Sequence, residues 1–171
     1  HDKESNYFPL TVDYEERFYA SGQILGSQYV RREGRPTEEA ILRGRIIDRT
    51  LRPLFPQFIR REVQVGVTTL AIDEYDPDIF AVIAGSLSIA TSDIPWNGPV
   101  GAVRIARKRG SDSWIVNPTF LERPDEGLDF EMVVCGKDGQ INMIEVEAGE
   151  VSEDEMIEAL NVASKFIGEV E

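Results

Sequence analysis

The sequence has 171 residues, of which 42% are hydrophobic and 29% are charged, and its formal net charge is −13. This length and composition predict one globular domain, and no apolar run approaches the roughly 20 residues that are needed to cross a bilayer. One cysteine, Cys135, and one histidine, His1, exclude an internal disulfide and a zinc site built from Cys and His. Because Cys135 lies in an apolar run, we expect a buried strand thiol rather than a nucleophile.

The first regular element is expected near the N-terminus, where Phe8, Leu10 and Val12 recur at every second position, as in a half-buried strand. Because the sequence opens so directly on a strand, we expect earlier strands of the same sheet to be missing from it. A short helical turn over Glu15 to Ala20 and a flexible loop from Gly22 to Gly34 are expected to follow.

The next predicted element is a helix, for which Pro36 fits the first position and Glu38 and Glu39 complement the helix dipole. Pro53 and Pro56 end it. The residues expected on its buried face recur at helical spacing: Ala40, Gly44, Ile47, Leu51 and Leu54.

The rest of the chain predicts a second helix and then mostly hairpins. In order, we expect a strand over 62–73, a buried helix over 77–91, and strands over 100–107, 114–116, 128–135 and 141–146, the last two joined by a turn at 137–140. A capping box of Ser152 and Glu155 opens a closing helix over 152–171. Since no linker or repeat interrupts it, the sequence predicts a single domain over residues 1–171 without its opening strands, of the α+β class and built in layers.

Basic residues are concentrated between Tyr29 and Arg61. This segment holds nine of the 18 basic residues of the chain, all of them arginine, and its formal charge is +5, so the other residues sum to −18. Arginine matches phosphate oxygens two at a time, and a local basic cluster on an acidic background attracts anions. We therefore expect this segment to contact a phosphate polymer.

The arginines at the start of this segment are the stronger candidates for anion contact. Arg31, Arg32 and Arg35 lie in a glycine-flanked loop that leads into a helix N-terminus, whose free N–H groups also favour anions. Tyr29, in the same loop, offers a ring on which a base can stack.

The arginines within the predicted helix have a structural explanation. Two pairs have the i,i+4 spacing in the favourable order: Glu39 with Arg43, and Asp48 with Arg52. We expect structural roles for these side chains, with anion contact as the alternative: Arg43, Arg45, Arg49 and Arg52.

Acidic residues dominate the C-terminal part, where residues 122–171 hold 15 acidic and three basic side chains. Four carboxylates there suggest a metal cluster: Asp125, Glu126, Asp129 and Glu131. In so acidic a stretch, however, a solvated acidic face is the expected interpretation. The acidic run from Asp73 to Asp78 is expected to be a turn with a helix cap.

Six motifs run through almost the whole chain. They are FPLTVDY at 8–14, RREGRP at 31–36, RIIDR at 45–49 followed by RPLFP, EVQV at 62–65, DIPWNGPVGAVR at 93–104 and VNPT at 116–119. In this order they closely resemble the polynucleotide phosphorylase family, and specifically the first of its two RNase PH-like core domains. The resemblance implies the RNase PH-like layered fold, which is ribosomal protein S5 domain 2-like, without its opening strands.

The resemblance also implies a function. It implies a 3′-to-5′ exoribonuclease that uses inorganic phosphate and Mg²⁺ to cleave RNA and releases nucleoside diphosphates. The expected partners are RNA, two further copies in a homotrimer, and the second core, KH and S1 domains of a longer chain. An RNA-degradation complex is a further expected partner, and no membrane is. The expected compartment is the bacterial cytoplasm, with an organelle as the alternative.

In that family the second core performs the chemistry. This segment is therefore expected to be catalytically silent, to guide RNA and to build the trimer. Two alternatives stay open: a self-contained RNase PH-like phosphorolytic enzyme, and a purely structural oligomerisation domain.

Only some of the functional residues of the family have a counterpart in this sequence. Its channel-loop motif, Phe-Phe-Arg-Arg, corresponds to residues 29–32, which implies RNA binding by Tyr29, Arg31 and Arg32. Arg35 matches the arginine that binds phosphate. The second phosphate element of the family falls near Gly85-Ser86 and lacks its arginine.

The paired aspartates that serve magnesium and acid catalysis in the family match only in part. Asp129 fits the second position, but Arg123 stands six residues earlier, where a cation would repel magnesium. An alignment shift onto Asp125 would partly restore the pair. The resemblance thus implies no catalytic residue or metal site in this segment, with Asp129 as a degenerate candidate, and no tight binding of Mg²⁺ or phosphate.

Overall fold

The structure, a computed structural model, describes residues 6–24, 36–111, 113–123 and 127–171. Its strands and helices are β1 (Leu10–Glu16), α1 (Glu38–Leu51), β2 (Val63–Thr69), α2 (Pro77–Ala90), β3 (Gly101–Lys108), β4 (Trp114–Val116), β5 (Leu128–Lys137), β6 (Gln140–Ala148) and α3 (Glu153–Val170). Short 3₁₀ turns cover Phe18–Ser21, Arg52–Leu54 and Phe120–Glu122. None of the described helices is long and apolar enough to cross a membrane.

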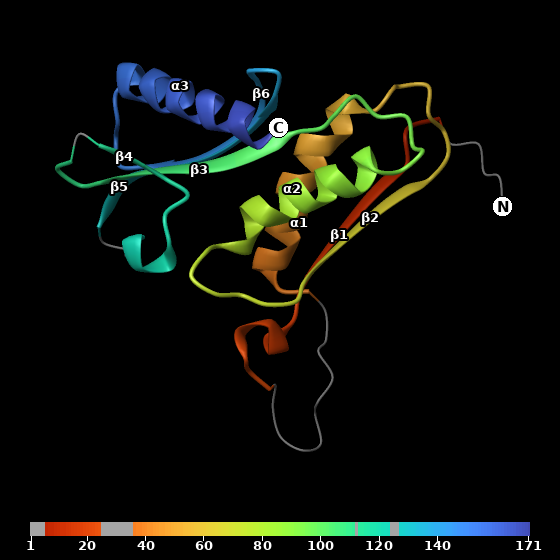
Figure 1. The fold of residues 1–171 in the computed structure, drawn as a ribbon, viewed down its shortest axis with the longest axis horizontal. Helices are drawn as coiled ribbons and strands as arrows, with labels where there is room; N and C mark the ends of the chain where they lie inside the picture. The colour runs from red at the N-terminus through yellow and green to blue at the C-terminus, as the bar shows by residue number, and fades with distance from the viewer. Residues whose placement is uncertain (1–5, 25–35, 112, 124–126) are drawn as a thin grey trace.

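The described elements form four layers (Figure 1). Strands β1 and β2 pair in parallel, and the larger, antiparallel sheet has the strand order β4-β3-β5-β6. Helices α1 and α2 lie between the two sheets, whereas α3 covers the other face of the larger sheet. The predicted α+β class, built in layers, is confirmed.

The larger sheet contributes to two apolar cores, one on each face. Ala102 and Cys135 lie opposite each other and pack with α1 and α2. Their neighbours Val103 and Val134 also lie opposite each other, but pack with α3. Because successive strand residues point to opposite faces, strands covered on both faces favour apolar residues at successive positions. This explains the apolar runs at 101–103 in β3 and at 132–135 in β5.

Helix α1 begins later than predicted. The side-chain oxygen of Thr37 accepts a hydrogen bond from the backbone N–H of Ala40 at 3.1 Å, so Thr37 caps the helix and Pro36 precedes it. The prediction that Pro36 occupies the first helical position was therefore wrong. The predicted stripe is confirmed for four residues that are buried: Ala40, Gly44, Ile47 and Leu51.

Two strand boundaries differ from the predictions, whereas the turn between β5 and β6 and the capping box agree with them. Strand β1 continues through Glu16, where a helical turn was expected, and β2 ends at Thr69, before the predicted end at Asp73. The turn between β5 and β6 is confirmed at Asp138 and Gly139, which both have positive φ angles. The capping box that opens α3 is confirmed as well.

Candidate functional site

The loop that was expected to contact RNA lies outside the described residues. Tyr29, Arg31, Arg32 and Arg35 all belong to residues 25–35, so their roles stay predictions. The first described residue after this loop is Pro36, next to the cap of α1.

Arg52 joins the end of α1 to β1. Its Nε donates to the Asp48 carboxylate at 3.0 Å, and its Nη2 donates to the Leu10 carbonyl oxygen at 3.1 Å. The predicted i,i+4 pair and the structural role are confirmed for Arg52. Arg45 and Arg49 are exposed and form no ion pair with other described residues.

The predicted pair between Glu39 and Arg43 is wrong. Arg43 instead pairs with Glu16, at the end of β1, and lies 3.2 Å from Asp76, at the start of α2. Asp76 is largely shielded from water, whereas Glu39 is exposed. Because an ion pair is stronger in a less polar environment, Arg43 pairs with the shielded carboxylates.

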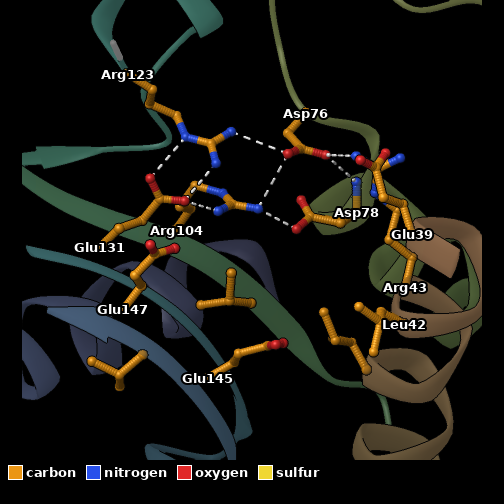
Figure 2. Close-up of a pocket in the computed structure, with 13 residues that line it drawn as sticks. Glu39, Leu42, Arg43, Asp76, Asp78, Arg104, Arg123, Glu131, Glu145 and Glu147 are labelled. Carbon is orange, nitrogen blue, oxygen red and sulfur yellow. Dashed lines mark hydrogen bonds and ion pairs between the residues drawn. The ribbon is translucent and has the colours of Figure 1, made fainter. Parts of the chain in front are cut away.

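A network of arginines and carboxylates joins α2, β3 and β5 (Figure 2). Arg104 of β3 donates to both Asp78 and Glu131 and lies 3.4 Å from Asp76. Arg123 binds two of the same carboxylates, through Nη1 to Asp76 at 3.0 Å and through Nε to Glu131 at 3.0 Å. The Arg43–Asp76 pair extends the network to α1, and we call these six residues the ion network.

The local sequence explains why the ion network forms here. Arg104 is only 7% exposed because it occupies a strand that is covered on both faces, and a buried charge requires charged partners. Asp76 caps α2 by accepting a hydrogen bond from the Asp78 backbone N–H at 3.4 Å. This cap places both aspartates against the arginine. The predicted helix cap in the run from Asp73 to Asp78 is therefore confirmed, but its carboxylates also bind Arg104.

The two aspartates of α2 have opposite pKa shifts. Burial alone would raise the pKa of Asp76, but Arg43, Arg104 and a hydrogen bond from Arg123 outweigh it, so its pKa lies below the usual value. Burial raises the pKa of Asp78 more than Arg104 lowers it, and the nearby Asp76 carboxylate raises it further. The pKa of Asp78 therefore lies above the usual value. Arg104 is thus the main cation that keeps Asp78 ionised in a nearly buried position.

The ion network forms one wall of a pocket of about 560 Å³ (Figure 2). Three further carboxylates line this pocket, from Glu39 of α1 and from Glu145 and Glu147 of β6, and none of them forms an ion pair with other described residues. Carboxylates outnumber guanidinium groups six to three in the lining. This excess of carboxylates disfavours the binding of phosphate groups in the pocket.

The N-terminus of α2 could otherwise attract an anion, as helix N-termini do. Asp76 and Asp78 already place their own carboxylates there, and Asp78 Oδ1 accepts the Ile79 N–H at 2.7 Å. The chain itself therefore supplies the anions at this helix end.

Asp129, the candidate carboxylate at the start of β5, is bound by an arginine. Arg107 Nε lies 3.1 Å from Asp129 Oδ1, and the same guanidinium also binds Glu155 at 2.5 Å and lies over the Trp114 ring. Glu131 belongs to the ion network. The prediction of a solvated acidic face is therefore wrong for Asp129 and Glu131, because arginines on the neighbouring strand β3 bind both carboxylates.

The described carboxylates do not fit a magnesium site. No group of three His, Cys, Asp or Glu side chains in the described ranges is arranged to hold a metal ion. Arg107 at Asp129, and Arg104 and Arg123 at Glu131, place positive charge where a divalent cation would need to bind. Asp125 and Glu126 lie outside the described residues.

Most of the chain matches the models of a known protein family. Residues 1–95 match the 3′ exoribonuclease family, domain 1, and residues 98–165 match domain 2 of the same family. The chain belongs to this RNase PH family.

The family includes close relatives of the chain. It is 49% identical to polyribonucleotide nucleotidyltransferase of Thermus thermophilus over 95% of this chain, and 47% identical to that of Thermosynechococcus vestitus over the same share. The relative from Exiguobacterium sibiricum is 43% identical over 98% of the chain. The chain spans only 22% of the length of each of these relatives. Polyribonucleotide nucleotidyltransferase is also called polynucleotide phosphorylase. These relatives therefore confirm the predicted relationship to a core domain of that enzyme.

A solved structure confirms the predicted RNase PH-like fold. The Archaeoglobus fulgidus exosome with RNA bound to the active site matches 99% of this chain and 72% of its own chain, with a TM-score of 0.72 at 16% identity. At this identity the likeness concerns the fold.

The second phosphate element of the family, which lacks its arginine here, was placed near Gly85-Ser86. These residues lie in the middle of α2, within the helix that was predicted over 77–91. The Ser86 hydroxyl is buried and accepts a hydrogen bond from the Val100 N–H at 2.9 Å. It therefore fixes the loop before β3 and is not available to a phosphate.

The ion network itself was missed by sequence reasoning. Arg104 and Arg107 were treated as ordinary members of a strand, although both interrupt an apolar run, and both chain neighbours of Arg104 are buried. A charged side chain at such a position signals a buried ionic partner. The partners Asp76 and Glu131 are 28 and 27 residues away in sequence, so only the fold identifies them.

Proposed function

We propose that the chain is the catalytically silent first core domain of a phosphate-dependent 3′-to-5′ exoribonuclease that degrades RNA to nucleoside diphosphates. In this proposal the segment guides RNA and builds a homotrimer, while a second core performs the chemistry. The relatives named polyribonucleotide nucleotidyltransferase support it, since the chain covers 22% of their length and leaves room for further domains.

One observation carries the proposal of silence: of the two positions that the resemblance assigns to Mg²⁺, Arg123 occupies the first, and Arg107 binds Asp129 at the second. Asp129 is bound by Arg107, and Glu131 by Arg104 and Arg123. Breaking such a pair costs up to roughly 3–5 kcal/mol where both partners are buried, and less where one is partly exposed, as Asp129 is. A magnesium ion would have to compensate this cost at more than one carboxylate. We therefore assign Mg²⁺ and inorganic phosphate to the second core of the full protein.

The proposed RNA contacts lie in the loop before α1. Arg31 and Arg32 are assigned to RNA phosphates, Arg35 to phosphate, and Tyr29 to base stacking. The acidic pocket at the ion network repels RNA, which favours contact at the basic loop instead. Three copies of this loop around one channel would raise the effective concentration of contacts and hold RNA more firmly than one copy.

The full protein is proposed to act in the bacterial cytoplasm, with KH and S1 domains as further RNA contacts on the same chain and with an RNA-degradation complex as a partner. The bacterial sources of the relatives support this setting.

Two measurements separate this proposal from its alternatives. RNA crosslinking to the assembled protein should fall when Arg31 and Arg32 are both replaced by Ala, and unchanged crosslinking would favour a purely structural domain. Phosphate-dependent release of nucleoside diphosphates by the 171-residue chain alone would favour a self-contained enzyme.

A further inference from the structure

Strand β6 lies at an edge of the larger sheet (Figure 1), and no described strand pairs with its outer side. Its outer backbone N–H and C=O groups are therefore available to an added strand. The seven residues 144–150 are all exposed, although most of them belong to a strand. This edge is long for an unprotected strand, because β6 has nine residues.

One face of β6 is acidic. Glu145 and Glu147 line the pocket of about 560 Å³ together with Glu39 of α1, and both side chains are drawn on the pocket side of β6 in Figure 2. None of these three carboxylates forms an ion pair with another described residue. Glu150 follows in the same exposed stretch, and residues 144–150 contain no basic side chain. This side of the edge therefore attracts positive charge.

The opposite face of β6 is apolar. Ile144 and Val146 alternate with the two glutamates, so they point toward the side of the sheet that carries α3. Their register partners on β5, Val134 and Met132, are both fully buried beneath α3. Helix α3 packs mainly on β3 and β5, which leaves Ile144 46% and Val146 38% exposed.

The charges decide which kind of strand fits this edge. A second copy of β6 would bring glutamates close to glutamates, and like charges across a strand pair are destabilising. We propose that the outer edge of β6 binds an extended segment of a partner protein in which Lys or Arg alternates with aliphatic residues.

Each part of such a segment has a defined counterpart on this chain. Its backbone continues the hydrogen-bond ladder of the sheet, which supplies affinity without sequence preference. Its basic side chains lie above Glu145 and Glu147, and its aliphatic side chains cover Ile144 and Val146. The period of two in the partner matches the period of two in β6, and this match provides the specificity.

A synthetic peptide tests the proposal. The probe is a fluorescent, capped peptide of nine residues, the length of β6, in which Lys and Val alternate, and the control peptide has the same composition with the Lys and Val residues in two blocks. We expect the alternating peptide to bind the 171-residue chain and to protect the amides of 144–148 from hydrogen exchange. The block peptide should bind at least about tenfold more weakly.

Charge-reversal variants provide the matched control. The double variant Glu145→Lys/Glu147→Lys should lose about tenfold or more in affinity for the alternating peptide and should gain affinity for a peptide of alternating Glu and Val. The control variant Glu158→Lys/Glu169→Lys changes the net charge by the same amount, but at exposed positions of α3. Its affinity for the alternating peptide should stay within about twofold of that of the parent chain.

Four results would overturn the proposal. Three of them are an equal loss of affinity in both double variants, equal binding of the alternating and block peptides, and absence of any binding. Self-association of the chain through β6 in sedimentation experiments would also overturn it, because it would assign the edge to a second copy.

Discussion

Arg104 and Asp78 form an ion pair in which both side chains are nearly buried, with exposures of 9% and 6%. The pair joins β3 to the first turn of α2 and so fixes the helix against the larger sheet. Glu131, on β5, shares the same guanidinium group. The proposal that this core is silent depends on such pairs, because they engage carboxylates that would otherwise be free to bind a cation.

The first prediction concerns the stability of the ion network. Arg104→Met should lower the free energy of unfolding by about 3–5 kcal/mol, because Asp78 is left buried without its main cation. Urea unfolding measures this loss. Arg45→Met is the control, since Arg45 is exposed and has no ion-pair partner among the residues that the structure describes, and it should stay within about 0.5 kcal/mol. A loss below about 1 kcal/mol in Arg104→Met would show that the network is not a stabilising unit.

The second prediction concerns pH. The hydrogen bonds from the Ser152 hydroxyl and N–H, followed by that from Arg107, lower the pKa of Glu155 from 4.5 to about 2. A carboxyl group with a lowered pKa in the folded state stabilises the protein above its ordinary pKa, and this contribution is lost as the pH falls toward about 2. Glu155→Gln should therefore be less stable than the parent chain at neutral pH, and the difference should shrink between about pH 4.5 and 2.

Urea unfolding at several pH values tests this second prediction. Glu153→Gln removes a neighbouring carboxylate of the same helical turn that is outside the capping box, and it serves as the control. A stability difference for Glu155→Gln that is the same at all pH values would contradict the assigned ionic role.

The third prediction concerns the single cysteine. Burial raises the pKa of the Cys135 thiol to about 12, and the side chain is fully buried in β5. Because the thiolate is the reactive form, iodoacetamide should not label the native protein at neutral or mildly alkaline pH, and it should label the protein rapidly in urea. Rapid native labelling would show that β5 opens far more readily than its position between two helical layers allows.

Several features of the fold could be predicted because they depend on local sequence. The stripe of α1, the cap of α2 and the capping box at Ser152 and Glu155 each involve residues within a few positions of one another. The hairpin at Asp138 and Gly139 is equally local. The start of α1 was predicted too early because Pro36 and Thr37 both favour the start of a helix. The helix begins after Thr37 because its hydroxyl group accepts a hydrogen bond from the Ala40 N–H.

The ion network could not be predicted in the same way, because its partners lie far apart in sequence. Arg43 has Glu39 at the favourable helical spacing, yet it pairs with Glu16 and Asp76 after β1 and α2 are brought beside α1. Glu131 lies in an acidic stretch of the sequence, so its side chain was expected to be exposed to solvent. It pairs with Arg104 instead, because antiparallel pairing places β5 beside β3.

The fourth prediction concerns RNA. If Arg31, Arg32 and Arg35 contact phosphates, the logarithm of affinity for single-stranded RNA should fall with the logarithm of salt concentration with a slope of about −2, a loss of about twentyfold between 50 and 200 mM salt. Replacing Arg31 and Arg32 by Ala should reduce the slope to about −0.7. Fluorescence anisotropy with a labelled oligonucleotide measures both slopes.

The control for the RNA measurement is Arg45→Ala/Arg49→Ala, which removes two exposed arginines from α1. We expect this variant to retain the parent slope. An equal reduction in both variants would assign RNA contact to the helix as well as to the loop.

The division of labour between two cores is tested most directly by the release of nucleoside diphosphate from a 3′-labelled RNA by the 171-residue chain, in the presence of Mg²⁺ and inorganic phosphate. Because arginines bind Asp129 and Glu131, we expect no release above that of a protein-free sample. Phosphate-dependent release that the substitution Asp129→Asn abolishes would contradict the assignment of a silent core.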